Sequence, residues 1–170
     1  IYTGRGVLIE SKGPAWLYGT ASEHNQLYNY QVNNAKDIFM GFIQTETPYY
    51  QDNPTALVPF TPQKKWTDPD FSTCTTDSCR KSWGLRVLNS SDFHLYGAGL
   101  YSFFNNYDQS CIAEGSCQEN ILQVDCSDVH IHGLSTIASV NMVTSTGGQG
   151  LIPGAENMST FCSTVALFEQ

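Results

Sequence analysis

Charged residues, and above all positive ones, are scarce in this sequence. Of its 170 residues only 14% are charged, with 8 lysines and arginines against 16 aspartates and glutamates, which gives a net charge of −8. An average soluble domain has about 25% charged residues. Proteins that bind phosphate backbones need clustered lysine and arginine, so this composition argues against nucleic acid as a partner.

Long apolar runs and helical periodicity are also missing. No segment approaches the roughly 18–20 apolar residues that a membrane-spanning helix needs, which argues against a membrane partner. Apolar residues instead alternate over short runs rich in Val, Ile, Phe, Tyr and Leu, bounded by Asn, Asp, Ser and Gly. This pattern is typical of β-strands, so the sequence predicts an all-β fold.

The six cysteines form an even set, which is typical of proteins from oxidising compartments. Proximity in the sequence favours the disulfides Cys74–Cys79 and Cys111–Cys117, each closing a short loop. The remaining pair, Cys126–Cys162, would then anchor the C-terminal segment. The sequence alone does not fix this connectivity. Two glycosylation triplets, at Asn89 and Asn157, also favour a secreted, extracellular protein.

Metal and cofactor sites are not predicted. The short cysteine spacings fit zinc ligands poorly. His130 and His132 share one face of a strand, a spacing that suits a metal, but no third ligand is evident. We therefore expect neither a metal nor a cofactor.

Four segments share one pattern, in which a polar residue and two variable residues precede an Asp or Pro anchor and then apolar-x-apolar. The shortest interval between anchors is about 23 residues, a length typical of structural repeats. If this interval is one unit, the two longer intervals contain extra residues. These extra residues correspond to a proline-rich insertion at about 47–82 and a cysteine loop at about 105–119. The anchors are Pro14, Asp37, Asp92 and Asp128.

A repeat of short strands with insertions on one face predicts a parallel β-helix, of the kind seen in pectin-lyase-like solenoids. An antiparallel sandwich, whose strands also recur at short intervals, is the alternative. Four coils are few, and the chain begins at Ile1 without an initiator methionine or a signal peptide. We therefore expect residues 1–170 to be the C-terminal part of a longer solenoid.

The repeat places two glutamates at equivalent positions, because Glu23 and Glu46 each lie at the same distance after an anchor. Stacked strands are about 4.8 Å apart, so the two carboxyl groups could lie roughly 5–10 Å apart. Glycoside hydrolases use carboxyl pairs in this range. The equivalent position on the third coil is Tyr101, a hydroxyl donor.

Five blocks of the sequence closely resemble fungal exo-β-1,3-glucanases of glycoside hydrolase family 55. The resemblance is strongest in the first four blocks, looser in the last, and extends over nearly the whole chain. The blocks are 4–11 (GRGVLIES), 16–25 (WLYGTASEHN), 33–51 (NNAKDIFMGFIQTETPYYQ), 97–109 (GAGLYSFFNNYDQ) and 161–166 (FCSTVA).

The resemblance implies a larger secreted enzyme built from two tandem right-handed parallel β-helices, with the active site between them. Such enzymes release glucose or short units from the non-reducing end of β-1,3-glucan with inversion of configuration. The family's general acid matches Glu46, and Glu23 matches a residue implicated in holding the attacking water. Other residues of the site belong to an N-terminal β-helix, so we expect that part of the enzyme to be a partner and this fragment alone to be inactive.

Polar and aromatic residues beside the two glutamates are candidates for binding a sugar. Tyr49 and Tyr50 could stack on a pyranose ring or merely pack the insertion. The substrate-binding candidates are His24, Gln44, Tyr49, Tyr50, Tyr101 and Tyr107.

Two further functions compete with an inverting glucan exohydrolase. The first is a non-catalytic β-helix that binds glucan or a protein partner through the aromatic insertion. The second is an eliminase of the pectate-lyase type, which needs a calcium-binding carboxylate cluster and a basic catalyst. No arginine stands in register with Glu23 and Glu46, so the eliminase ranks last.

Overall fold

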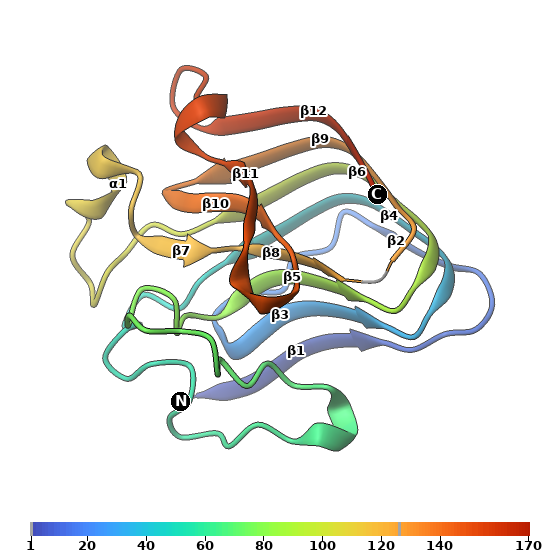
Figure 1. Cartoon of the computed structure of the whole chain (residues 1–170), viewed down its shortest axis with the longest axis horizontal. Helices are drawn as coiled ribbons and strands as arrows, with labels where there is room; N and C mark the ends of the chain where they lie inside the picture. Colours follow the sequence, from blue (N-terminus) through green and yellow to red (C-terminus); the bar gives the residue numbers. More distant parts are fainter. Residues whose placement is uncertain (1, 126) are drawn as a thin grey trace.

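β-Strands dominate the computed structural model, which describes residues 2–125 and 127–170 (Figure 1). They form two sheets, which we call the first and second sheets, with the orders β1–β3–β5–β8–β10–β11 and β2–β4–β6–β9–β12; β7 also pairs with β10. The first sheet contains β1 (Thr3–Ile9), β3 (Asn25–Asn33), β5 (Trp83–Leu88), β7 (Gln118–Asn120), β8 (Leu122–Asp125), β10 (Ser139–Thr144) and β11 (Gly150–Pro153). The second contains β2 (Ala15–Tyr18), β4 (Lys36–Glu46), β6 (Ser91–Tyr101), β9 (Val129–Ile137) and β12 (Ser163–Glu169).

The helices are short and lie in the connections. None of them, over the residues described, is long and apolar enough to cross a membrane. They are η1 (Lys64–Trp66), α1 (Cys111–Glu114), η2 (Thr146–Gly148) and η3 (Ala155–Asn157).

Strand pairing follows the repeat that the sequence predicts. Ala15 pairs with Ile38, Ile38 with Phe93, and Phe93 with Val129. Each of these residues directly follows an anchor, so the paired strands are separated along the chain by the same intervals as the anchors. All three pairings are parallel, and they confirm the predicted register.

The all-β class is confirmed, and the antiparallel sandwich is excluded. In the first sheet, β3 pairs in parallel with both β1 and β5. Among the strands described, only the β10–β11 and β9–β12 pairs are antiparallel.

The recurring spacing of the motif has a backbone cause. Asn34 and Asp37 adopt positive φ angles of 51° and 56°, and their counterparts Asn89 and Asp92 adopt 45° and 51°. Asn and Asp tolerate this left-handed conformation better than other residues with a Cβ atom. In these two units, the turn that leads into the second sheet therefore favours Asn or Asp at the polar position and at the anchor.

A second left-handed position recurs along the second sheet. Gly19, Phe42, Gly97 and Gly133 occupy equivalent places in successive units, with φ angles of 60°, 55°, 70° and 72°. Glycine suits this conformation because it has no Cβ. Phe42 is the exception, and its side chain is 75% exposed.

Apolar side chains from both sheets meet in the core. The apolar-x-apolar residues that follow the anchors Asp37, Asp92 and Asp128 are buried in one cluster, with 0–1% of each residue exposed. They stack across neighbouring strands, so each unit buries its apolar face against the next. The pairs are Ile38/Met40, Phe93/Leu95 and Val129/Ile131.

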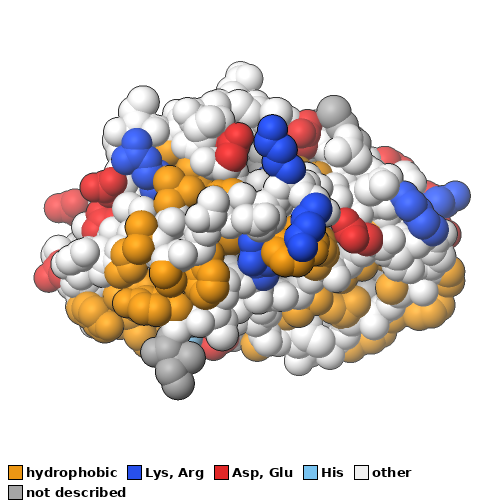
Figure 2. Space-filling model, turned by 90° about the horizontal axis from the view of Figure 1, so that it is seen from below, with side chains coloured by type: hydrophobic (Ala, Val, Ile, Leu, Met, Phe, Trp, Pro, Cys, Tyr) orange, Lys and Arg blue, Asp and Glu red, His pale blue; other side chains and the backbone are white. Residues whose placement is uncertain are grey.

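The end of the stack formed by β1 and β2 is apolar. β1 pairs with β3 and β2 pairs with β4, and the opposite edge of each is unpaired among the described residues. Trp16 and Tyr18 on β2 are exposed, as is Val7 on β1. Figure 2 views the molecule from this side and shows apolar side chains gathered over it.

The connection from β4 to β5 spans residues 47–82 and carries only η1 among the elements described. The Cys74–Cys79 disulfide lies inside it, in a cluster with Tyr28 and Trp83. Arg5 Nε donates to Asp68 Oδ1 at 2.8 Å, which ties the connection to β1. These contacts hold the segment over the first sheet.

The Cys111–Cys117 disulfide closes the loop that contains α1. The predicted Cys126–Cys162 pair involves Cys126, which lies outside the described residues, and Cys162 pairs with no other described cysteine. Of the two glycosylation candidates, Asn89 is exposed, whereas Asn157 donates its side-chain amide to the Pro153 carbonyl at 2.8 Å.

Leu95→Ala should lower the free energy of unfolding by about 2–5 kcal/mol, because Leu95 is fully buried and its removal leaves a cavity in the core. Chemical denaturation measures this. Leu167→Ala is the matched control, since half of Leu167 is exposed, and it should cost about 0.5 kcal/mol or less. Equal losses in the two variants would contradict the placement of the core.

Candidate active site

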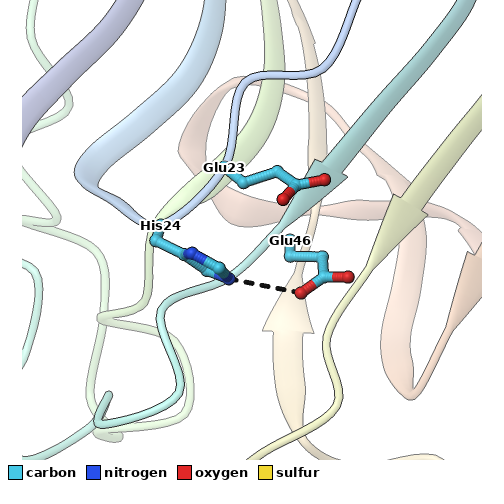
Figure 3. Close-up of side chains that lie close together, drawn as sticks. All are labelled: Glu23, His24 and Glu46. Atoms are coloured by element: carbon cyan, nitrogen blue, oxygen red, sulfur yellow. Dashed lines mark hydrogen bonds and ion pairs between the residues drawn. The ribbon is translucent and has the colours of Figure 1, made fainter.

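Glu23 and Glu46 lie side by side on neighbouring repeat units (Figure 3). Ala21 bridges to Gln44, and the backbone N–H of His24 donates to the Glu46 carbonyl at 2.9 Å, so the register of β2 and β4 continues through both glutamates. Both side chains are partly exposed and extend in the same direction. The register thus places two carboxylates on one open surface.

One oxygen of Glu46 has two polar partners. Tyr49 donates its hydroxyl to Glu46 Oε2 at 3.0 Å, and His24 Nε2 lies 3.2 Å from the same atom. Asn29 donates to the Glu46 backbone carbonyl at 3.2 Å, which fixes the end of β4. No described residue hydrogen-bonds to Oε1, so that oxygen is available to a ligand.

Glu23 has a partner of its own, since Gln44 Nε2 donates to Glu23 Oε1 at 2.7 Å. Ligand atoms of Glu23, His24 and Glu46 all lie within 4.8 Å of one another. Inverting glycosidases hold their two carboxyl groups about 6.5–9.5 Å apart, to leave room for a water. The nearest carboxylate oxygens of Glu23 and Glu46 are closer than that range.

Among the described residues, these three are also arranged closely enough to hold a metal ion. A metal there would occupy the carboxylate oxygens that acid catalysis needs. His130 and His132 are engaged separately: His130 Nδ1 lies 3.1 Å from Glu169 Oε1, and the His132 ring stacks on Tyr96.

Aromatic rings pack around the Glu46 side chain. The Tyr49 ring lies edge-on to His24 at 4.4 Å between centroids and against Phe104 at 4.5 Å. Burial, followed by the hydrogen bond to Glu46, raises the pKa of Tyr49, so its hydroxyl stays a donor at neutral pH. These contacts hold the tyrosine that orients Glu46.

A depression of about 340 Å³ opens beside this cluster, lined by Tyr2, His24, Tyr49, Tyr50 and Tyr107. Four of the five are predicted substrate-binding residues. Tyr2, the fifth, lies edge-on to Tyr50 at 5.1 Å between centroids. It precedes β1 and belongs to no repeated position, so no sequence signal indicated it. Burial raises the pKa of Tyr50 to about 12.

The other two candidates, Gln44 and Tyr101, line a separate depression of about 300 Å³. Tyr101 pairs with Glu46 in register. Its ring folds back over Gly99, where a Cβ atom would lie only 2.6 Å from the ring. Tyr101 therefore lies over its own strand and forms no hydrogen bond with Glu46 in the described structure, whereas Gln44 links this depression to Glu23.

A buried lysine, which the sequence did not indicate, supports the loops around the site. Lys81 is 1% exposed, and its Nζ donates to the Phe104 carbonyl at 3.2 Å, Asn105 Oδ1 at 2.9 Å and the Cys117 carbonyl at 2.6 Å. Phe104 packs on Tyr49, so this ammonium group joins the insertion, the disulfide loop and the aromatic wall. Burial lowers the pKa of Lys81 to about 8.

Lys81 should make the unfolding free energy rise with pH between about 8 and 10.5. The folded protein has released the proton in that range while the unfolded chain, with an ordinary pKa of 10.5, still binds it, and stability rises wherever the unfolded state binds more protons. Denaturation of the parent and of Lys81→Met at several pH values tests this. The unfolding free energy of the parent minus that of Lys81→Met should increase from pH 8 to 10. All other titrating groups are the same in both proteins, so their contributions cancel in this difference.

The exposed Lys64→Met is the control for this experiment. Its difference from the parent should not change over the same pH range. A flat difference for Lys81→Met would contradict the lowered pKa.

Comparison with known proteins shows that the chain is similar to parts of longer fungal proteins, two of which are named as glucan glucosidases. It is 62% identical over its whole length to a protein named probable glucan endo-1,3-beta-glucosidase from Arthroderma benhamiae, of which it covers 19%. It is 40% identical over 97% of its length to a glucan 1,3-beta-glucosidase from Cochliobolus carbonum, of which it covers 21%. It is also 40% identical over 97% of its length to a protein named non-secreted LysM effector LysM15 from Penicillium expansum, of which it covers 11%.

No family model matches the chain. The resemblance to glucan 1,3-beta-glucosidases is nevertheless confirmed by similarity that runs through nearly all of its residues. The chain spans about a fifth or less of the length of these curated relatives.

Proposed function

We propose that this chain is part of a secreted fungal enzyme of glycoside hydrolase family 55 that hydrolyses β-1,3-glucan, with Glu46 as the general acid. The observation that carries the proposal is the setting of Glu46: one carboxylate oxygen is held by Tyr49 and His24 and the other is free of described partners, beside an aromatic depression. The names of two relatives support the substrate.

The fold we propose is the C-terminal end of a right-handed parallel β-helix, in which each repeat unit is one coil. From β1 to β7 the chain passes alternately between the two sheets, and equivalent residues pair in parallel from unit to unit. Both features support a solenoid. The insertion at 47–82 and the disulfide loop at 105–119 interrupt it. The relatives are much longer, and we propose that an N-terminal β-helix of the same enzyme completes the site.

Catalysis begins with a proton on Glu46. Protonated Glu46 donates to the glycosidic oxygen, the bond from that oxygen to the anomeric carbon breaks, and a water adds to the anomeric carbon. Tyr49 and His24 orient the carboxyl group through Oε2. Rings lining the adjacent depression can stack on the sugar.

Glu23 takes a supporting role in this mechanism. Its nearest carboxylate oxygen lies closer to Glu46 than the separation typical of an inverting acid–base pair. An inverting pair is spaced more widely to leave room for the attacking water, so we assign the base to the rest of the enzyme. Glu23, held by Gln44, positions a water or a sugar hydroxyl.

Two features of the chain support an extracellular location. The disulfides Cys74–Cys79 and Cys111–Cys117 are typical of oxidising compartments. Asn89, in an exposed turn, is a glycosylation acceptor by sequence. Both are expected of a secreted enzyme.

Glu46→Gln in the full-length enzyme should lower kcat on laminarin by about 100-fold or more, because general acids contribute roughly 10²–10⁴-fold. Glu156→Gln is the matched control, since Glu156 is exposed in η3 and should leave kcat unchanged. Initial rates of sugar release measure both. A Glu46→Gln enzyme within tenfold of the parent would remove Glu46 from the acid role and favour a non-catalytic, glucan-binding fragment.

The products should show inversion and exo action. NMR spectra recorded within the first minutes of laminarin hydrolysis should contain α-glucose before the β anomer appears by mutarotation. Early release of β-glucose would instead indicate retention and restore Glu23 as a candidate nucleophile, because the close pair suits that mechanism. A ladder of long oligosaccharides at early times would indicate endo action, as the name of the Arthroderma benhamiae relative states for that protein.

A further inference from the structure

A second cavity shares no lining residue with the depressions beside Glu46. It has a volume of about 280 Å³ and lies between the 69–74 segment of the insertion, strands β5, β7 and β8 of the first sheet, and the 146–148 turn. Small-molecule sites measure roughly 300–1,000 Å³, so this cavity suits a single small ring rather than a chain.

A buried guanidinium group supplies the first polar contact in the cavity. Arg86 is 6% exposed, and burial lowers its pKa to about 10. Its Nε donates to Gln123 Oε1 at 2.8 Å, and its Nη1 donates to Gln31 Oε1 and to the Thr67 carbonyl. None of these bonds to described residues uses Nη2, so a buried and rigidly held side chain keeps a free donor at the cavity.

Further polar atoms line the same space. Asp70 Oδ1 accepts from both the N–H and the hydroxyl of Ser72 at 3.0 Å, which lowers the Asp70 pKa and keeps the carboxylate charged. These bonds leave Oδ2 as a free acceptor. Gln123 uses its oxygen for Arg86 and keeps its amide N–H groups as donors.

The charges around Arg86 argue against an anion. Three carboxylates lie near enough to Arg86 to oppose the lowering of its pKa by burial: Asp68, Asp70 and Asp125. Asp70 also lines the cavity. An incoming phosphate or carboxylate would meet this negative charge. A neutral molecule with several hydroxyl groups would use the donors and the acceptor together.

Aromatic rings form the apolar part of the lining. Phe71 and Trp83 both border the cavity and pack in one cluster. A pyranose presents hydroxyl groups at its edge and C–H groups on its faces, which match polar atoms and aromatic carbon respectively. We propose that the cavity is a non-catalytic binding site for a single neutral pyranose, glucose. The lining residues support a neutral ligand with several hydroxyl groups. The choice of glucose rests on the proposed function, because the proposed reaction releases glucose.

Fluorine NMR of the full-length protein labelled with 5-fluorotryptophan tests this, with the Trp83 signal assigned from Trp83→Phe. Glucose should shift the Trp83 signal saturably, with a dissociation constant of about 1–10 mM, as for one small sugar with a few hydrogen bonds. Asp70→Asn should weaken binding about tenfold through loss of one charged acceptor, while its remaining oxygen still accepts from Ser72. Thr146→Trp, at an exposed position of the turn, should block the cavity and abolish the shift.

The control is Asp77→Asn, which removes one negative charge outside the cavity, where Asp77 pairs with Arg80 at the surface. It should bind glucose like the parent. The proposal is overturned if glucose gives no saturable shift, if inorganic phosphate binds instead, or if Asp70→Asn binds within twofold of the parent. Because the readout is a bound-state signal at Trp83, its failure is distinguishable from a failure of Glu46→Gln to lower kcat.

Discussion

Parallel backbone pairing in a fixed register is the constraint on which the rest of the structure depends. When β2 pairs with β4, each side chain of β2 has a defined neighbour on the next repeat unit. The same register buries Ile38 against Phe93 and brings Glu23 beside Glu46. A slip by one position would turn each side chain to the opposite face and destroy core and site together.

Local conformation reinforces this register. The left-handed residues Asn34 and Asp37 before β4 match Asn89 and Asp92 before β6, and these two strands begin in register, with Lys36 paired to Ser91. The long connections between the strands then supply the groups that surround Glu46. Lys81 links three backbone or side-chain oxygens of adjacent loops, and through Phe104 it supports the ring of Tyr49. The regular coils thus set the position of Glu46, while the irregular loops set its surroundings.

Features with a local sequence signal could be predicted, namely the repeat and the two short disulfide loops, whereas contacts made by long loops that fold back could not. The strand register and the inward pairs follow from alternation and turn residues, which are local signals. Tyr2 and Lys81 have no counterpart in another coil, and their importance depends on how long loops fold back. Tyr101 lies at the predicted register, but its ring turns over Gly99, because a neighbouring glycine leaves space that backbone register does not reveal.

The closeness of Glu23 and Glu46 is itself a consequence of the fold. Side chains that leave adjacent strands in register start about 4.8 Å apart, so two carboxylates on neighbouring repeat units naturally lie near each other. An inverting mechanism instead needs a base across the ring, at a separation that neighbouring strands do not provide. A single stack of coils therefore supplies an acid and its supporting groups more readily than a complete inverting pair. This geometry is a physical reason to propose that a second β-helix contributes the other side of the active site.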